Sequence, residues 1–273
     1  MVPKYSIVGG CTMHLVFAAH AEKAEPKAAC RRLMKLAEEA GFSCEILSDE
    51  TQPKPNEDTF IVAVGGDGNF IRTAHLACER GLPLFGVNCG HIGFLTEWVE
   101  QEFPRVLEAL KSKDYMIRNV PLLSARVNDG CACDCFNDLL VYKQSFSGVT
   151  RITIEINGQE IGTLNGDGVI VATAIGSTGY SLSAGGPILA DGTDATVITP
   201  ICAHTLHFRP VVTSGDSVIT MTMEDKGFLA SDGDRFCSVQ NGDRITVTRS
   251  EHSVKLLTFR KRNLFRLIAE KLV

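Results

Sequence analysis

The sequence lacks any apolar run that approaches the roughly 20 residues a membrane-spanning helix requires. It also lacks the pattern of a secretory signal, because Met1–Tyr5 leads directly into a short apolar pair, Ile7-Val8. These two absences predict a protein that has no membrane partner and resides in the cytoplasm.

Basic residues are not in excess either. The chain has 27 Lys and Arg against 32 Asp and Glu, and its formal net charge is −5. Proteins devoted to nucleic acid are usually basic, so we expect no nucleic-acid partner. Two nucleotide-binding patterns are also missing: the P-loop G-x-x-x-x-G-K-[ST], and a G-x-G-x-x-G after the first strand, where only Gly9-Gly10 is found. Their absence disfavours a P-loop enzyme and a dehydrogenase.

What is present is the composition of a globular protein, with 44% hydrophobic and 22% charged residues. A length of 273 residues suffices for two ordinary domains. Most of the ten cysteines are isolated, as Cys30 and Cys78 are, and are expected to be small buried side chains.

The cluster Cys131, Cys133 and Cys135 is the exception, because C-x-C-x-C could bind a soft metal or oxidise. No second Cys or His pair lies nearby at zinc-site spacing, and in a strand the three thiols would share one face. We therefore expect no protein-bound metal.

The first part of the chain alternates strand and helix patterns. Apolar spacing predicts helices over Glu25–Ala40 and Phe103–Lys111, and short apolar runs predict strands at Cys44–Leu47, Phe60–Val64 and Leu84–Val87. Such alternation is typical of a parallel α/β sheet, whose ligands lie at the carboxyl ends of the strands. We expect a Rossmann-like parallel α/β domain over residues 1–118.

The pattern changes after about Asn119. Short strands separated by turn signals such as Asn157-Gly158 predict a β-rich, sandwich-like domain over residues 119–250. The tail, residues 251–273, ends in apolar residues at helical spacing from Arg262 to Val273. Because a lone helix must bury its apolar face, we expect the tail to pack back on the α/β domain.

The stretch Gly65-Gly-Asp-Gly68 follows the predicted strand Phe60–Val64 and precedes a helical pattern. Backbone N–H groups at such a helix N-terminus can face a phosphate, and glycines allow a close approach. Asp67 is unusual there, because a carboxylate repels phosphate. It suggests a base for a hydroxyl group or a metal ligand. The alternative is a plain turn in which Asp67 caps the helix.

Three further stretches carry polar groups. Asn88–Glu97 begins at a strand end, and Asn137-Asp138 offers an amide and a carboxylate that suit a base edge and ribose hydroxyls. Each could also be an ordinary turn. The third, Gly162–Pro187, is rich in glycine and hydroxyl groups around a buried strand, which favours a backbone held close to a ligand over a flexible loop.

Together these motifs resemble those of the NAD kinases. The resemblance rests on the stretches Gly65–Gly68, Asn88–Leu95, Asn137-Asp138, Gly166–Gly168, Thr173–Pro187, His204–Pro210 and Ser231–Gly233, which occur in that order. It implies an α/β domain and a β-rich domain with a site between them. It also implies a homodimer or homotetramer in which neighbouring subunits contribute to the site.

The implied reaction transfers the γ-phosphoryl group of ATP, or of polyphosphate, to the 2′-hydroxyl of the adenosine ribose of NAD, forming NADP. Asp67 is the implied base. Mg²⁺ or another divalent cation would be bound with the nucleotide. The residues implied to bind the nucleotides are Gly65, Gly66, Gly68, Asn69, Asn88, Asn137, Asp138, Asp167, Thr173, Ser177, Thr178, Gly179, Tyr180 and Ser183.

The chain departs from the family pattern at two of these positions. Members usually carry glutamate where Asp138 stands and alanine where Gly179 stands, so Asp138 has a shorter reach to the ribose. Two alternatives remain at this point: a non-catalytic dinucleotide-binding protein, and a kinase with the same glycine motif that acts on another hydroxyl acceptor, such as a lipid.

Overall fold

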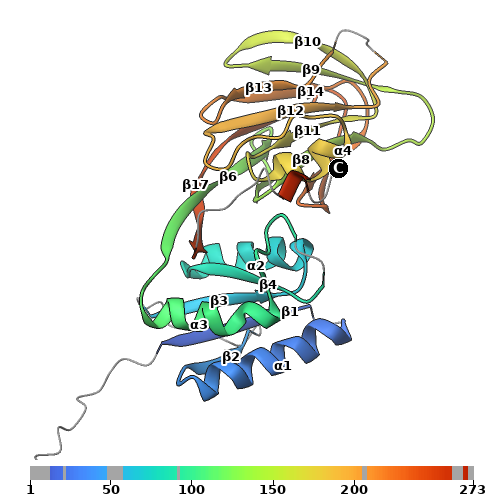
Figure 1. Ribbon diagram of the computed structural model, residues 1–273. Coiled ribbons are helices and arrows are strands. Elements are labelled where there is room, and N and C mark those ends of the chain that lie inside the picture. The colour runs from blue at the N-terminus through green and yellow to red at the C-terminus, as the bar shows by residue number, and fades with distance from the viewer. Residues whose placement is uncertain are drawn as a thin grey trace, which may run out of the picture. The chain divides into compact units, whose positions relative to one another are not determined.

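The computed structural model describes residues 13–20, 23–47, 58–90, 93–204, 208–259 and 267–269 (Figure 1). The chain divides into two compact units. Unit 1 contains Met1–Asn119 and Val254–Lys261, and unit 2 contains Val120–Ser253 and Arg262–Val273. The divisions fall within two long strands, β6 (Met116–Val127) and β17 (Arg244–Thr258).

Unit 1 is built on a parallel sheet in the order β2-β1-β3-β4. Its strands are β1 (His14–Ala19), β2 (Ser43–Ile46), β3 (Thr59–Val64) and β4 (Leu84–Asn88), with the short β5 (Trp98–Val99) and the end of β17 also paired to β4. Every residue of β3 and β4 is buried, which explains their unbroken apolar character. The strand order reverses between β1 and β3, and the carboxyl ends at such a switch point are where open α/β sheets bind ligands.

Helices cover both faces of this sheet (Figure 1). α1 (Ala24–Glu39) and α3 (Phe103–Lys111), which follows the 3₁₀ turn η1 (Glu100–Glu102), bury their apolar stripes in one core with β1 and β3. α2 (Asp67–Arg80) covers the opposite face and buries Phe70 and Ala74. It ends at Gly81, whose φ of 64° is the left-handed conformation that glycine adopts readily.

Unit 2 consists of two antiparallel sheets. One contains β9 (Thr150–Ile156), β10 (Gln159–Gly166), β14 (Ile219–Met223), β7 (Ala132–Cys135) and the unit 2 portions of β6 and β17. The other has the order β13-β12-β11-β8-β15-β16, formed by β8 (Asp138–Lys143), β11 (Gly168–Ala172), β12 (Ala195–Ile201), β13 (Val211–Ser214), β15 (Gly227–Ser231) and β16 (Asp234–Val239). The 3₁₀ turn η2 (Gly176–Thr178) and the single-turn α4 (Tyr180–Ser183) follow β11.

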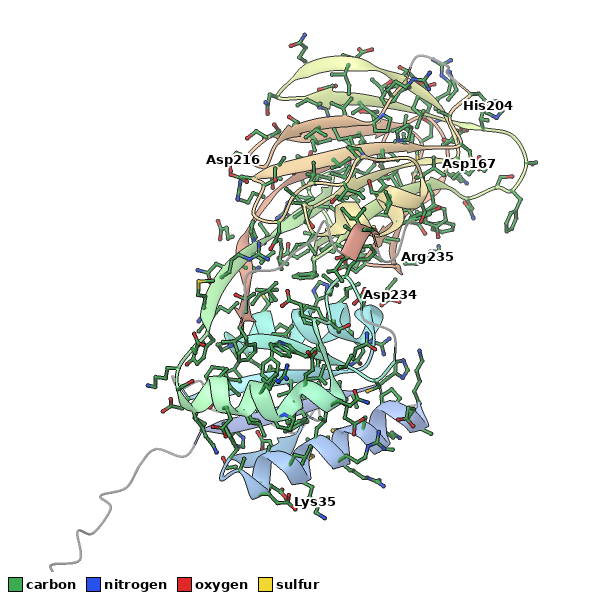
Figure 2. All side chains as sticks on the ribbon, viewed as in Figure 1. Lys35, Asp167, His204, Asp216, Asp234 and Arg235 are labelled. Carbon is green, nitrogen blue, oxygen red and sulfur yellow. The ribbon has the colours of Figure 1, made fainter. Side chains whose placement is uncertain are left out.

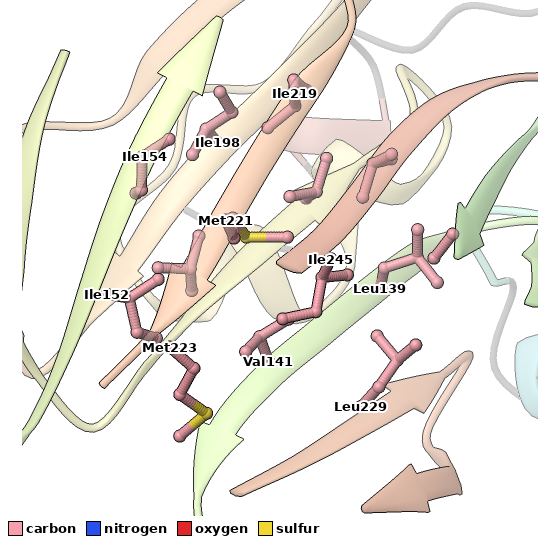
Figure 3. Packing of buried hydrophobic residues seen from close by; sticks show 14 of the residues in the cluster. Leu139, Val141, Ile152, Ile154, Ile198, Ile219, Met221, Met223, Leu229 and Ile245 are labelled. Atoms are coloured by element: carbon pink, nitrogen blue, oxygen red, sulfur yellow. The ribbon is translucent and has the colours of Figure 1, made fainter. Parts of the chain in front are cut away.

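The core of unit 2 lies between these sheets (Figure 3). Ile152, Met221 and Ile245 come from one sheet, and Leu139 and Leu229 come from the other. All five are fully buried. The two sheets therefore form a sandwich around a shared apolar layer, which confirms the predicted α/β plus β-sandwich-like fold.

Some predicted elements differ from the structure. The first described strand is β1, whereas the predicted strand at Ile7-Val8 lies outside the described residues. The hairpin of β15 and β16, and strand β13, were not predicted. β17 continues to Thr258, beyond the predicted β-rich domain of residues 119–250, and carries residues from 254 onward into unit 1.

Most of the tail helix predicted from Arg262 to Val273 also lies outside the described residues, with only 267–269 described, as helix. The division into units groups Arg262–Val273 with unit 2 and not with the α/β unit. The expected packing of this helix on the α/β unit stays a prediction. None of the helices in the described part of the chain combines the length and apolar character that a membrane crossing requires.

Candidate functional site

The glycine turn joins the carboxyl end of β3 to the N-terminus of α2. Gly65 has a φ of 140°, a value that side chains disfavour, and its N–H donates to the Val87 carbonyl oxygen at 2.9 Å. Gly66 and Gly68 are exposed, and a Cβ at either would meet nothing within 4 Å. Packing does not require glycine at these two positions. The N–H groups of Asn69 and Phe70 donate to the Gly66 carbonyl oxygen, whereas those of Asp67 and Gly68 have no acceptor in the described part of the chain and are open to an anion.

Asp67 turns its carboxylate away from solvent and onto the loop that precedes β5. One oxygen, Oδ2, accepts the N–H of Phe94 at 2.7 Å, and Oδ1 accepts the N–H groups of Leu95 at 3.0 Å and Thr96 at 3.2 Å. The Thr96 hydroxyl also donates to Oδ1 at 3.2 Å. A carboxylate has about four acceptor positions, so Asp67 is fully engaged in this conformation. The sequence did not predict this contact.

Gly93 makes this contact possible. A Cβ at Gly93 would lie 1.9 Å from Oδ1 of Asp67 and 2.5 Å from Oγ1 of Thr96. No side chain fits in that space, so the glycine of the Asn88–Leu95 motif is required for the loop to wrap the carboxylate. The sequence could not show why Gly93 is required, because it did not show that this stretch contacts Asp67.

Two predicted amide residues of unit 1 serve the scaffold. Asn88 is 5% exposed, donates from Nδ2 to the Thr96 hydroxyl at 2.7 Å, and accepts the Gly90 N–H at Oδ1. Asn69 donates from Nδ2 to the carbonyl oxygens of Ala18 at 3.0 Å and Val64 at 3.2 Å. Since Ala18 and Val64 lie near the ends of β1 and β3, Asn69 ties the two strands at the switch point.

In unit 2 the turn Asp232-Gly233 positions the predicted amide–carboxylate pair. The Asp232 carboxylate accepts the N–H groups of Phe136 and Asn137 at 2.7 Å each and that of Asp138 at 3.1 Å. Asp232 itself has a φ of 50°, an uncommon conformation that aspartate tolerates better than most residues. Asp234, the first residue of β16, follows this turn (Figure 2). The motif Ser231–Gly233 was recognised in the sequence, but no role was assigned to Asp232.

The side chains of the pair have no such partners. Oδ1 of Asn137 is buried and accepts no hydrogen bond from the part of the chain that the structure describes. Asp138 is 7% exposed, and its carboxylate likewise has no hydrogen-bond partner among the described residues. Burial, and then the nearby Asp232 carboxylate, raise the pKa of Asp138 from 3.8 to about 7. A buried polar group without a partner is costly, which is typical of a site that awaits a ligand.

The glycine-rich segment after β11 packs directly against this pair. The Thr173 N–H donates to the Asn137 carbonyl oxygen at 2.8 Å, and the Thr173 hydroxyl donates to the Phe136 carbonyl oxygen at 2.8 Å. A Cβ at Gly176 would lie 2.0 Å from the Asn137 carbonyl oxygen, so only glycine fits there. A Cβ at Gly179 would lie 3.4 Å from Nδ2 of Asn137 and 3.6 Å from Oδ2 of Asp138. Glycine at this position leaves the pair less covered than a residue with a side chain would.

The predicted hydroxyl residues fall into two groups. Ser177 is fully buried, donates to the Ala174 carbonyl oxygen at 2.6 Å and accepts the Leu189 N–H, while the Thr178 hydroxyl donates to the Ile175 carbonyl oxygen at 3.1 Å. Both hold the turn in shape. Tyr180 is 48% exposed and Ser183 is exposed, so these two can meet a ligand from solvent.

Asp167 lies in unit 2, in the turn between β10 and β11 (Figure 2). Its carboxylate forms an ion pair with Nζ of Lys143 at 2.6 Å, which holds the pKa of Asp167 below its usual value. Ala172 at the far end of β11 pairs with Asp138. Five strand residues span about 17 Å, so a compact ligand cannot touch both carboxylates.

The structure therefore brings the predicted residues together in sets. Unit 1 holds Gly65, Gly66, Asp67, Gly68, Asn69 and Asn88, and one part of unit 2 holds Asn137, Asp138, Thr173, Ser177, Thr178, Gly179, Tyr180 and Ser183. Within the described ranges no three His, Cys, Asp or Glu side chains are grouped to hold a metal ion.

The chain is similar to known proteins along both units. Family models of the ATP-NAD kinase N-terminal domain and C-terminal domain match residues 14–115 and 136–259. The NAD kinase of Geotalea daltonii is 37% identical over 225 residues, which are 80% of this chain and 79% of the relative. That of Natranaerobius thermophilus is 34% identical over 242 residues, 86% of this chain and 82% of the relative.

Solved structures show the same architecture. Yeast NADH kinase complexed with NADH has a TM-score of 0.82 at 22% identity, covering 96% of this chain and 87% of that one. An NAD kinase from Archaeoglobus fulgidus in complex with ATP has a TM-score of 0.74 at 25% identity, covering 95% and 97%.

Proposed function

The chain belongs to the ATP-NAD kinase family, and from that premise we propose how its residues transfer the γ-phosphoryl group of ATP to the 2′-hydroxyl of NAD's adenosine ribose. The observation that carries the proposal is the buried pair in unit 2. Asn137 has an amide oxygen without a partner, and Asp138 has a carboxylate without a hydrogen bond from any described residue. An amide and a carboxylate with these vacant positions suit a ligand that offers an amino group and a diol.

The adenosine part of NAD supplies those groups. Its adenine amino group can donate to Oδ1 of Asn137, and a ribose hydroxyl can donate to the carboxylate of Asp138. The space left by Gly179 admits the sugar close to the pair. Exposed Tyr180 offers an aromatic face and Ser183 a hydroxyl group beside them. This arrangement would fix the ribose while leaving its chemistry to another residue.

Unit 1 supplies the phosphate-binding part. The N–H groups at the start of α2 and the positive end of its helix dipole favour the phosphates of the donor. Phosphoryl transfer depends mainly on such positioning and on charge neutralisation. The backbone N–H groups at the start of α2 provide the positioning. The hydrogen bond of Gly65 and those from Asn69 to β1 and β3 hold this turn in place.

Asp67 acts mainly by orientation in this proposal. A carboxylate is a weak base in the ground state but can accept the proton of the 2′-hydroxyl late in the transfer. To do so, one oxygen must exchange a loop N–H group for the hydroxyl. Oδ1 is the better candidate, because two of its three contacts are long, at 3.2 Å. The same carboxylate thus shapes the loop and contacts the acceptor.

Other parts of the reaction are proposals that rest on the family alone. A divalent cation such as Mg²⁺ would be bound with the phosphates of ATP and neutralise their charge. Polyphosphate remains an alternative donor. A homodimer or homotetramer in the cytoplasm is expected, and in such an assembly Asp167 could serve the site of a neighbouring subunit.

The test is the formation of NADP by the purified protein from NAD or NADH with ATP-Mg²⁺ or polyphosphate. Asp67→Asn should lower kcat about 1000-fold or more and leave the affinity for NAD within a few-fold. NAD binding with no turnover for any donor would favour the non-catalytic alternative.

A matched control separates the chemical role of Asp67 from its structural role. Thr96→Val removes one hydrogen bond to Asp67 and the partner of Asn88 but keeps the carboxylate. It should cost activity about 10-fold or less, in line with one lost hydrogen bond. If Asp67→Asn retained turnover, or if Thr96→Val were as severe, the assigned role would be wrong.

A further inference from the structure

Two thiols that the kinase reaction does not use meet on the surface of unit 2. Sγ of Cys131, just before β7, lies 3.0 Å from Sγ of Cys237 in β16. Both cysteines are free, and they are 106 residues apart in the sequence. Cys131 is exposed and Cys237 is partly buried. Their approach therefore reflects the packing of two distant segments rather than a local turn.

We propose that Cys131 and Cys237 form a reversible disulfide, a modification site that joins the start of β7 to β16. A disulfide has a bond length of about 2.05 Å, so the sulfur atoms need to approach by only about 1 Å. A small rotation of the exposed Cys131 side chain can supply that movement without rebuilding either strand. The proposal rests on the geometry of unit 2 alone and does not depend on the kinase reaction.

The neighbouring cysteines are less suited to this bond. Cys133 and Cys135 follow at alternate positions of β7 and turn toward the core of unit 2, as the strand pattern predicts for residues two apart. Burial is the main factor that raises the pKa of Cys133 to about 12 and that of Cys135 well above its usual value. Cys237 has a similarly raised pKa, so what disfavours Cys133 and Cys135 is their position against the core rather than their protonation.

The chemistry requires an oxidant, for which we take a small-molecule disulfide such as oxidised glutathione. The Cys131 thiolate attacks one sulfur of the oxidant, forms a mixed disulfide and releases one glutathione thiolate. Cys237 then loses its proton to solvent and attacks the Cys131 sulfur, which releases the second glutathione. The two cysteines are oxidised and one oxidised glutathione is reduced to two thiols. Burial, chiefly, raises the pKa of Cys237 to about 12, so the second step should quicken as pH rises.

The new bond would reinforce a contact already described. β7 leads into Phe136–Asp138, and the β15–β16 hairpin carries Asp232, whose carboxylate accepts the N–H groups of that turn. The Ser231 hydroxyl also donates to the Asp134 carbonyl oxygen at 2.8 Å. The disulfide and these hydrogen bonds join the same two segments, so oxidation should stabilise unit 2 and preserve the position of Asn137 and Asp138.

The experiment treats the full-length protein with oxidised glutathione and maps its peptides without reduction. We expect one dominant linkage, Cys131–Cys237, that is reversed by dithiothreitol. It should be absent in Cys131→Ser and in Cys237→Ser. The matched control is Cys202→Ser, which removes another exposed cysteine of unit 2 and should retain the linkage. Thermal unfolding should shift upward by about 5 °C or more on oxidation, in the wild type and in this control only.

Three results would overturn the proposal. In the first, the wild-type protein gains only mixed disulfides with glutathione. In the second, Cys131 links mainly to Cys133. In the third, the unfolding temperature of the oxidised protein does not rise. Cys133→Ser distinguishes the second case, since it should leave the Cys131–Cys237 linkage intact. Because these readouts are masses and temperatures, a failure here leaves the kinase proposal untouched, and the reverse also holds.

Discussion

The polar side chains of unit 1 and unit 2 are used in opposite ways. In unit 1, Asp67, Asn69 and Asn88 each bind a neighbouring loop or strand of their own unit. In unit 2, Asp232 fixes Asn137 and Asp138 through their backbone. The buried amide oxygen of Asn137 and the carboxylate of the buried Asp138 have no hydrogen-bond partner among the described residues.

This difference follows from what each unit has to bind. A phosphate is well recognised by backbone N–H groups, so side chains in unit 1 are free to hold the backbone in shape. An adenosine group is recognised by its amino group and hydroxyls, which require side-chain acceptors placed in advance. Vacant acceptors cost stability, and unit 2 carries that cost in the free state. Substituting a vacant acceptor of unit 2 should therefore raise stability, whereas substituting a side chain that holds the backbone should lower it in either unit.

The largest effect should come from Asp232→Ala. The change leaves three N–H groups without their charged acceptor, and each such bond contributes about 1.5–3 kcal/mol. We expect KM for NAD to rise about 100-fold or more and unit 2 to lose about 3 kcal/mol or more of unfolding free energy. Steady-state kinetics measure KM, and urea unfolding measures the unfolding free energy.

Asp232→Asn is the matched control for that experiment. Asparagine tolerates the φ of 50° and keeps one acceptor oxygen, so it should fall between the wild type and Asp232→Ala. A KM for NAD within about 3-fold of the wild type in Asp232→Ala would show that this turn does not position the pair; Asp232 would then have only a structural role.

A smaller effect, confined to unit 1, is expected for Asn88→Ala. It removes the hydrogen bonds to Thr96 and Gly90, which should lower the unfolding free energy of unit 1 by about 1–3 kcal/mol. The loop that wraps Asp67 loosens, so kcat should fall about 10-fold. NAD affinity, measured by calorimetry, should be unchanged, because Asn88 has no part in unit 2. A weakened NAD affinity would contradict the separation of roles.

The smallest effect, and the one with the opposite sign, is expected for Asp138→Asn. The pKa of Asp138 is about 7 in the folded protein against 3.8 for an ordinary aspartate, so the folded state binds the proton more tightly. The stability from this group is present below pH 3.8 and is lost as pH rises to about 7. Removing the charge should raise the stability of unit 2 at pH 8 by about 2 kcal/mol, with a smaller gain at pH 5.

The same substitution should weaken NAD binding about 10-fold, because the ribose loses a charged acceptor. Stability and affinity would then change in opposite directions, as expected for a vacant binding group. A variant that is destabilised at pH 8 would show instead that Asp138 has a structural role like that of Asn88.

The sequence predicted much of the fold because its strongest patterns are local. The apolar spacing of α1, the unbroken apolar strand β3 and the glycine turn before α2 depend on neighbouring residues. β1 was missed because His14–Ala19 is short, without alternation, and competes with the equally apolar Ile7-Val8. β15 was missed because its partner β8 lies about 90 residues away, and β16 pairs only with β15.

The sequence named the candidate site residues, but it could not show which of them hold the scaffold and which are left to bind a ligand. Asn69, Asn88 and Ser177 have the same residue types as ligand-binding groups, and only their hydrogen bonds in the structure show that they hold the scaffold. Asp232 is 94 residues from Asp138, so nothing in the local sequence reveals their contact. Composition and spacing identify polar groups, whereas burial and partners decide which of them are vacant.

The most direct test of this difference is the number of protons released when NAD binds. Calorimetric titrations near pH 7 in buffers of different ionisation enthalpy give that number. If the ribose hydroxyls donate to Asp138, they favour its charged form and lower its pKa. Because Asp138 is about half protonated near pH 7, the wild type should release up to about half a proton and Asp138→Asn none. Equal release by both proteins, or none by either, would contradict the claim that Asp138 is a vacant acceptor for NAD.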